Sequence, residues 1–396
     1  MTLAAAIESR KADAPACSKS GPIARIDLFT DLDQAEKVWR SLEDQQYLYT
    51  PYQRFDFLRH WQRRVGVRDG QHPFVMVAYD REHKPLVLLP LGLSEMSGIR
   101  IARFLGGKHA TFNMGLWNRE FVKQVSRTDL DPICSAIRER SAADVLAFTQ
   151  QPLSWQDLPN PFALLARQPS ANDCPLLTIA RGTPATARIS HSFRRRLKAK
   201  ERKLMALPGY RYHAAVRDTD IRRLLDAFFR IKPLRMAEQG LPNVFAEPGV
   251  EAFIRDACMT TLPSGGHVIE MHALECDSDV IALFAGVADG HRFSMMFNTY
   301  TTSEASRHSP GLVLIRHIID HYAQRGYRAL DLGVGSDGYK KLFCKTSEPI
   351  FDCFVPLSAQ GTVAAATMSI ANRAKRLVKH SPALLSLAQG LQRALR

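Results

Sequence analysis

One stretch of the chain, residues 293–343, constrains the fold more than any other. It opens with an apolar, strand-like run at 293–300, and after a polar loop a helical pattern of apolar residues begins at 310. A second strand-like run at 328–332 then leads through a glycine-rich turn into a short basic segment. Strand, helix and strand in this order predict a βαβ unit. We therefore expect an α/β fold.

The helix in this stretch begins with Ser309-Pro310-Gly311. Serine favours the N-cap, proline suits the first helical position, and glycine allows a ligand to approach the backbone closely. A helix start also presents unpaired N–H groups and a positive dipole end, which attract phosphate. The tripeptide therefore indicates either a phosphate site or a simple helix start.

The composition indicates a globular protein with an anionic partner. A chain of 396 residues can hold two domains, and 45% hydrophobic with 23% charged residues is an ordinary balance for such a protein. The formal net charge of +14 favours binding of phosphates, nucleic acid or anionic lipid. Coenzyme A is one polyanion that fits this requirement.

Cysteines and apolar runs bear on the location of the protein. The seven cysteines are an odd number without CxxC spacing, which predicts reduced thiols in a cytoplasmic protein and no zinc site. No apolar run is long enough to cross a bilayer. Residues 1–21 lack the basic and apolar regions of a signal peptide, and we interpret them as a disordered leader.

The first half, residues 22–172, alternates predicted helices and strands. It includes a pair of strands at 74–79 and 85–93 that are joined by a polar turn. The pattern predicts an α/β unit without a catalytic constellation of its own.

A basic amphipathic helix is predicted at 189–204. Ile189, Phe193, Leu197 and Leu204 share one apolar stripe. The remaining surface carries seven basic residues and a single acid, Glu201; the basic residues are Arg194, Arg195, Arg196, Lys198, Lys200, Arg202 and Lys203. So uniform a sign predicts either a polyanion-binding face or a solvated surface helix. Nucleic acid ranks lower as the anion, because aromatic residues do not alternate with the basic ones.

Taken together, these segments resemble the GNAT acyltransferases, in the branch of the CelD-like acetyltransferases and the FemAB-type aminoacyltransferases. The resemblance is carried by the strand ending at Tyr300, Ser309-Pro310-Gly311, Gly326, Asp331-Leu332-Gly333, Gly335, Tyr339-Lys340 and Phe343. It implies a GNAT fold with two tandem GNAT-like halves, at 22–172 and 173–358, of which the first is mainly structural. A basic amphipathic helical tail is expected at 359–396.

The resemblance also implies where an acyl-CoA donor binds. The strand edge bonds the pantetheine and supplies a backbone N–H to the developing oxyanion, and the helix start binds the diphosphate. The residues expected in these roles are Phe297, Asn298, Thr299, Arg307, Ser309, Gly311 and Leu312. The basic helix, with Arg194, Arg195 and Lys198, is expected near the substrate groove.

Four residues are candidates for the chemistry. Tyr339 is placed to protonate the departing thiolate, or else packs in the core. Lys340 binds the reacting acyl group, faces solvent or binds phosphate. The base that activates the acceptor is Glu270 or Asp331, and His272, on the same strand face as Glu270, is a further possibility. Asp331 alternatively caps a turn. No metal is expected, because His317 and His321 fall on the polar face of their helix, where we expect solvent.

The function expected from the resemblance is transfer of an acetyl or other acyl group from acyl-CoA to an amine or hydroxyl of a sugar-derived acceptor in polysaccharide biosynthesis. Two alternatives stay open, a FemAB-type aminoacyltransferase that uses aminoacyl-tRNA and a non-catalytic protein that tethers polysaccharide machinery at the membrane. The basic tail either packs on the protein or rests on an anionic membrane, which would place the protein at the inner face of the cell membrane.

Overall fold

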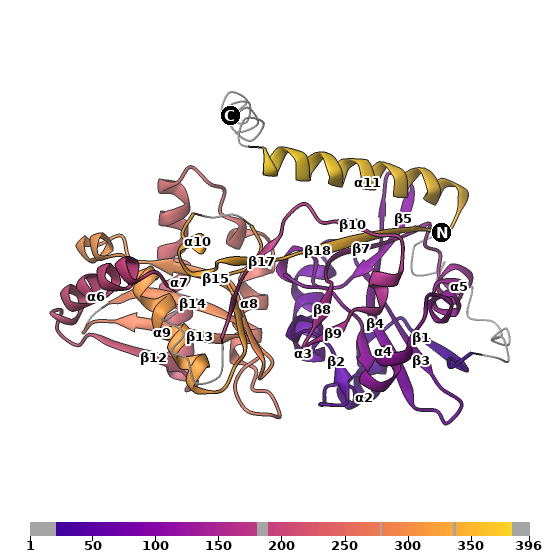
Figure 1. The fold of residues 1–396 in the computed structure, drawn as a ribbon, viewed down its shortest axis with the longest axis horizontal. Coiled ribbons are helices and arrows are strands. Elements are labelled where there is room, and N and C mark those ends of the chain that lie inside the picture. The colour runs from indigo at the N-terminus through magenta and orange to yellow at the C-terminus, as the bar shows by residue number, and fades with distance from the viewer. Residues whose placement is uncertain (1–20, 180–188, 278, 336–337, 382–396) are drawn as a thin grey trace. The chain divides into compact units, whose positions relative to one another are not determined.

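The computed structural model, drawn in Figure 1, describes residues 21–179, 189–277, 279–335 and 338–381. Most of the predicted leader and the end of the predicted tail, residues 382–396, lie outside the described residues. The chain forms two compact units. The first falls within Met1–Gln62, Gly66–Asp173 and Pro349–Arg396, and the second within Arg63–Val65 and Cys174–Glu348.

The first unit is built on a mixed sheet. In spatial order its main strands are β1 (Arg25–Phe29), β3 (His72–Tyr79), β4 (Pro85–Met96), β5 (Ile99–Phe104), β7 (Val145–Pro152), β18 (Ile350–Pro356) and β10 (Gln168–Pro169), with β2 (Tyr47–Leu48) and β6 (Leu116–Asn118) attached through β4. Only β5 and β7 pair in parallel among these described strands. A small hairpin, β8 (Ser154–Trp155) and β9 (Leu158–Pro159), stands apart.

The predicted strand pair of the first half is present as β3 and β4. Its turn is held by Asp80, whose carboxylate accepts the N–H groups of Glu82 and Lys84 at 2.9 and 2.8 Å. This is the usual role of aspartate in turns. The helices of this unit are α2 (Leu32–Ser41), α3 (Phe55–Trp61), α4 (Arg119–Gln124), α5 (Asp131–Arg140) and α11 (Ala359–His380).

The C-terminal part of the chain belongs to the first unit. β18 lies between β7 and β10 in its sheet, and α11, yellow in Figure 1, packs on β18, β7 and β5. Gly361 allows this contact, because a Cβ atom there would lie 1.7 Å from the carbonyl oxygen of Asp144. Residues 350–358, which the expected second half included, therefore belong to the first unit. A short apolar strand does not reveal by its own pattern which sheet it joins.

The second unit contains the predicted βαβ stretch. In spatial order its strands are β12 (Arg211–Ala215), β13 (Glu270–Glu275), β14 (Val280–Ala288), β15 (Arg292–Tyr300), β16 (Ala329–Asp331), β11 (Cys174–Thr178) and β17 (Thr346–Glu348). β15 and β16 pair in parallel through the crossover helix α9 (Pro310–Gln324), which confirms the predicted βαβ unit. The other helices are α6 (His191–Met205), α7 (Asp218–Glu238), α8 (Val250–Met259) and α10 (Lys340–Phe343).

The core beside α9 joins the apolar stripe of α6 to the sheet. Phe193, Leu197 and Leu204 of α6 are buried with residues of α9, and Phe193 meets Phe343 edge-on at 5.4 Å. In the described part of the chain, no helix has both the length and the apolar character that crossing a membrane requires.

Candidate active site

The edge of β15 becomes open halfway along the strand. Arg292–Ser294 pairs with Ala329–Asp331 of β16, whereas β15 itself continues to Tyr300. On its other side, β15 contains a β-bulge, because Ala285 pairs with Phe297 and Gly286 with Met295, so that Met296 is an extra residue. Bulges leave backbone groups outside the ladder. Backbone groups beside Met296 are therefore available to a ligand.

A glycine makes this bulge possible. A Cβ atom on Gly286 would lie 2.3 Å from the carbonyl oxygen of Ser294 and 2.6 Å from the ring of Phe293. Any other residue would thus push β14 and β15 apart at the point where the edge of β15 opens.

The predicted pantetheine-binding residues lie just beyond the bulge. The Phe297 ring is buried against Phe228, with 4.7 Å between ring centroids, and the Thr299 side chain is also buried. Their side chains are thus structural, and the strand register directs their backbone groups toward β14, so that the backbone of Asn298 between them faces the open edge. Lys232 donates to the Asn298 carbonyl at 3.0 Å, which leaves one lone pair of that oxygen for a ligand.

The start of α9 differs from a simple serine cap. Ser309 adopts a left-handed conformation, φ 52° and ψ 54°, and its side chain does not cap the helix. Its N–H group donates to the Ser306 carbonyl at 2.9 Å, and the Leu312 N–H donates to the Ser309 carbonyl at 3.0 Å. Two of the three amides expected to bind an anion are therefore engaged within the protein. Of the three, the amide of Gly311 has no acceptor among the described residues.

Cationic side chains gather at this helix start. Lys200 of α6 donates its ammonium group to Ser309 Oγ at 2.6 Å. His308 ends the short 3₁₀ helix η8 (Glu304–His308), and its pKa is lowered by desolvation and by the positive charges of Arg307, Lys203 and Lys200. A lowering of the His308 pKa by three cations indicates that these charges lie close to its imidazole. An anion at the start of α9 would relieve the repulsion.

The single acid of α6 fastens the helix to α9. Glu201 bonds to Arg316 and, at 2.8 Å, to His317. The remaining basic residues of α6 therefore have no acid of their own helix to pair with. The predicted substrate-binding residues Arg194, Arg195 and Lys198 are exposed on α6. Arg307, which was predicted to bind the acyl-CoA donor, pairs with exposed Glu304 at 3.2 Å.

Asp331 is removed from the candidate bases by its surroundings. It is fully buried, and one carboxylate oxygen accepts from Arg292 Nε at 2.7 Å and Ser294 Oγ at 2.5 Å, while the other accepts from the Gly333 N–H at 3.0 Å. Arg292 also binds Glu348 at 2.7 Å. The predicted turn-capping role is thus present, combined with a buried ion pair that a single strand cannot reveal in the sequence.

Lys340 is buried rather than facing solvent. Its side chain donates to the carbonyl oxygens of Gly333 and Val334 at 3.2 and 2.9 Å. A Cβ atom on Gly333 would lie 3.2 Å from the Met295 carbonyl, so the turn held by Lys340 abuts the bulged part of β15. Tyr339, in the N-cap position of α10, is half-buried and packs on the core.

Glu270 and His272 belong to one hydrogen-bonded chain. The Tyr322 hydroxyl donates to Glu270 Oε2 at 2.7 Å and lies 2.9 Å from His272 Nε2, while His272 Nδ1 lies 3.1 Å from the Tyr212 hydroxyl. Because Tyr322 has one proton and gives it to Glu270, His272 must donate from Nε2 and accept at Nδ1. The proton on Nε2 follows from these contacts, and the neutral form with an accepting Nδ1 agrees with the strong lowering of the His272 pKa, which burial causes first and neighbouring His321 second.

Glu270 lies in the same row of the sheet as the bulge. It pairs with Gly286, which in turn pairs with Met295. Since strands are about 4.8 Å apart, Glu270 lies about 10 Å from the backbone at Met295. The sequence predicted that Glu270 and His272 share a face, but it did not reveal the tyrosines, which looked like ordinary core residues.

The neutral state of His272 predicts a pH dependence of stability. The unfolded chain binds a proton at His272 below about pH 6.5, whereas the folded protein does not until much lower pH. The free energy of unfolding is therefore expected to fall as the pH drops below about 6.5, by up to about 1.4 kcal/mol per pH unit from this residue. Urea unfolding of the wild type and of His272→Gln between pH 7.5 and 5 measures this contribution of His272 to the pH dependence of stability.

The lowered pKa values of His213 and His321 also make the free energy of unfolding fall with falling pH. The slope of this free energy against pH in His272→Gln is therefore the reference from which the share of His272 is obtained. Equal slopes for the two proteins would show that His272 is protonated in the folded state.

The histidine pair of α9 is partly covered by an aromatic ring. His317 stacks on Tyr212 at 4.8 Å, and His321 meets the same ring edge-on at 6.2 Å. Both histidines keep part of their surface in contact with solvent, as expected for the polar face of α9, but β12 also supplies an aromatic partner that the sequence did not reveal. No group of side chains that could hold a metal ion occurs among the described residues.

Comparison with known proteins finds a family match over the part of the chain that contains this candidate site. Residues 191–341 match the family described as acetyltransferase (GNAT) domain. No curated protein matches the chain. FemX has a similar structure, with TM-score 0.54 and 8% identity over 82% of this chain and 96% of that one. So does the C-terminal domain of a putative lysylphosphatidylglycerol synthetase from Agrobacterium fabrum, with TM-score 0.51 and 12% identity over 86% and 95% of the two chains.

These similarities confirm the expected fold class of two tandem GNAT-like halves. At such low identity the solved structures support the fold alone, whereas the family match covers the start of α9, the bulge in β15, and the residue pair Tyr339-Lys340. Residues 191–341 therefore match an acetyltransferase (GNAT) domain, within a chain that has the tandem GNAT fold.

Proposed function

We propose that the second unit transfers an acyl group from acyl-CoA to an amine, or a hydroxyl, of a sugar-derived acceptor by direct attack on the thioester. The observation that carries this proposal is the cationic start of α9 beside the open edge of β15. A GNAT domain also implies an acyl-CoA co-substrate. The sugar-derived acceptor rests on the resemblance to the CelD-like branch.

The donor is expected to lie along this edge. Its diphosphate binds at the Gly311 amide and the Lys200 ammonium group, and the pantetheine follows the backbone of β15 toward Met296. A backbone N–H of the bulge then points to the thioester oxygen. A hydrogen-bond donor at this position contributes about 10²–10³-fold to the rate in other acyl-transfer enzymes.

The chemistry assigns one role to each remaining residue. The acceptor nitrogen or oxygen attacks the thioester carbon and loses its proton, through a water molecule, to Glu270. The C–S bond breaks, and Tyr339 protonates the thiolate. Lys340 sets the turn that abuts the bulge and so positions the acyl group. No covalent enzyme intermediate is needed.

Replacing Lys200 with methionine is expected to weaken CoA binding about tenfold, because the variant loses one charge at the diphosphate and its bond to Ser309. Isothermal titration of both proteins with CoA and acetyl-CoA at low and high salt measures the effect, and the difference should shrink at high salt. Lys37→Met, on α2 of the first unit, is the matched control and should bind as the wild type does.

Other outcomes of this titration point to other functions. The exposed basic face of α6 also suits tRNA, so binding of tRNA without binding of CoA would replace the proposal by a FemAB-type aminoacyltransferase. Binding of neither donor, with binding to anionic vesicles, would favour the non-catalytic tether.

Contact with an anionic membrane, at the inner face of the cell membrane, is a further part of the proposal. α11 exposes Val363, Ile370 and Leu377 at seven-residue spacing, each about two-thirds accessible. Lys375 and Lys379 are exposed on the same helix, which has no acidic residue. An apolar stripe flanked by lysines is typical of helices that lie on anionic lipid.

A further inference from the structure

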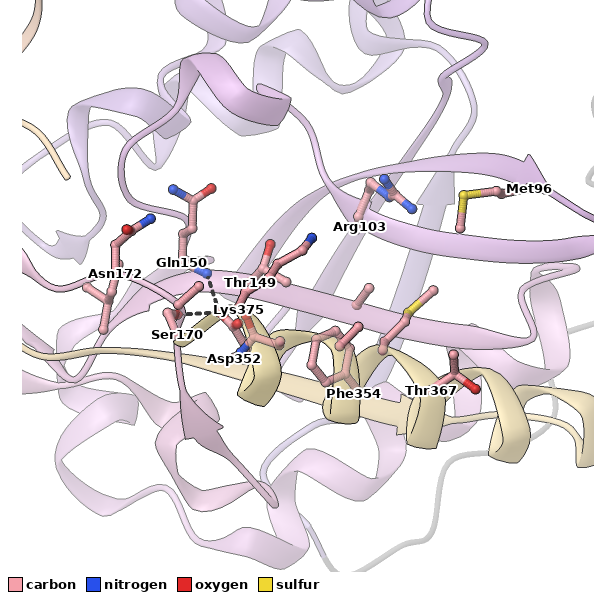
Figure 2. Close-up of a pocket in the computed structure, with 16 residues that line it drawn as sticks. Met96, Arg103, Thr149, Gln150, Ser170, Asn172, Asp352, Phe354, Thr367 and Lys375 are labelled. Carbon is pink, nitrogen blue, oxygen red and sulfur yellow. Dashed lines mark hydrogen bonds between the residues drawn. The ribbon is translucent and has the colours of Figure 1, made fainter. Parts of the chain in front are cut away.

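A cavity of about 600 Å³ lies in the first unit, between α11 and the sheet that this helix covers. Strands β4, β5, β7 and β18 supply its other walls, and Figure 2 shows the residues that line it. Nothing in the acyl-transfer proposal uses it. Its size is that of a small-molecule site.

Arg103 of β5 lines this cavity, and its guanidinium has no ion-pair partner in the part of the chain that the structure describes. Its Nε atom is buried and makes no hydrogen bond, and no carboxylate among the described residues lies within ion-pair distance of the guanidinium. Burial lowers its pKa, yet a guanidinium stays charged in proteins. A partly buried charge without a counter-ion is unfavourable, and an anion in the cavity would compensate it.

Among the described residues that line the cavity, the single carboxylate is already engaged. Asp352 accepts from the Gln150 backbone N–H at 2.8 Å and from the Ser170 hydroxyl, as the dashed lines in Figure 2 show. Lys375 of α11 adds a second cation to the lining. The cavity therefore has an excess of positive charge that its own acid does not balance.

The backbone at the cavity is shaped by a bulge. Phe351 pairs with Gln151 and Cys353 with Phe148, so Thr149 and Gln150 together face Asp352. Gln150 has a left-handed φ of 57°, which is uncommon for a residue other than glycine. Strained residues of this kind concentrate at binding sites, where the surrounding structure holds them in place.

The rest of the lining combines uncharged polar groups with an apolar surface. Amide and hydroxyl side chains come from Thr149, Gln150, Asn172 and Thr367, and the apolar part includes Phe354 and Met368. Amides and hydroxyls both donate and accept hydrogen bonds, as a ligand with several hydroxyl groups requires. A flat apolar surface suits the carbon face of a ring.

We propose that this cavity binds a small hydroxylated carboxylic acid, of the class of the sugar acids, whose carboxylate pairs with Arg103. The pairing is the planar, two-bond geometry that a guanidinium offers to a carboxylate. The proposal is independent of acyl transfer by the second unit.

Titration of the full-length protein with D-glucuronate tests the proposal, with D-glucose as the neutral probe and inorganic phosphate as a simple anion. The wild type should bind glucuronate in a saturable manner, and glucose and phosphate at least about tenfold more weakly. Arg103→Gln should lose at least about tenfold in glucuronate affinity, and Arg103→Lys should lose less, because it keeps the charge but not the fork.

Two controls separate this result from a folding defect. Arg138→Gln removes an exposed arginine of α5 and should bind glucuronate as the wild type does. Arg103→Gln should bind CoA normally and melt at or above the wild-type temperature, because it removes an uncompensated charge. Equal glucuronate binding by Arg103→Gln, absence of binding by the wild type, or tighter binding of phosphate than of glucuronate would each overturn the proposal.

Discussion

Replacing Arg292 with methionine is expected to lower the free energy of unfolding of the second unit by about 3–5 kcal/mol. Arg292 is 4% exposed and bonds to Asp331 and Glu348, and Asp331 itself is fully buried. The variant leaves two carboxylates close together without their cation. Ser294 and the Gly333 N–H still bond to Asp331, but neither carries a charge.

Urea unfolding can assign this loss to the second unit. All four tryptophans, Trp39, Trp61, Trp117 and Trp155, lie in the first unit, so their fluorescence reports that unit while circular dichroism reports both. The dichroism transition of Arg292→Met should move to lower urea, whereas the fluorescence transition should move less. An unchanged dichroism midpoint would contradict a stabilising role of the ion pair.

Arg211→Met is the matched control for this substitution. Arg211 also binds a buried acid, Glu275, at 2.8 Å, but its side chain is 65% exposed and Arg223 remains beside the same carboxylate. We expect a loss of less than about 1 kcal/mol, as for other exposed ion pairs. The two variants together test whether burial and the absence of a second cation determine how much the free energy of unfolding falls when the arginine is removed.

Replacing Glu270 with glutamine is expected to lower kcat by about 10²–10⁴-fold while leaving the affinity for acetyl-CoA unchanged. Glutamine keeps an oxygen that can accept the Tyr322 hydroxyl, so the fold should persist. It has no carboxylate to take the proton of the acceptor. Release of the CoA thiol from acetyl-CoA in the presence of amino sugars measures kcat.

Glu251→Gln, on the exposed surface of α8, controls for loss of a negative charge and should have wild-type activity. Wild-type kcat in Glu270→Gln would exclude Glu270 as the base. A loss of acetyl-CoA affinity of the same size as the loss of kcat/KM would instead indicate a role in donor binding.

Local patterns in the sequence were sufficient for much of the second unit. Apolar periodicity predicted α6, α9 and the parallel pair β15 and β16, because each pattern is contained in one short segment. The same reasoning placed Ser309 and Gly311 at the start of α9.

Pairings between distant segments decided what the sequence did not show. Lys200 and Ser309 are 109 residues apart, and Arg292 and Asp331 are 39 apart. The bulge at Met296 depends on how β14 and β15 align, which neither strand shows alone. The unpaired Arg103 is apparent only once every neighbour of β5 is in place.

The position of β18 between β7 and β10 fixes an order of events during synthesis. The first unit is not continuous in the sequence, because β18 of its sheet follows the second unit along the chain. A nascent chain leaving the ribosome must therefore carry an unfinished first sheet until residue 356 has emerged. The second unit, which ends at Glu348, has by then been synthesised completely. It can therefore fold before the first unit is complete.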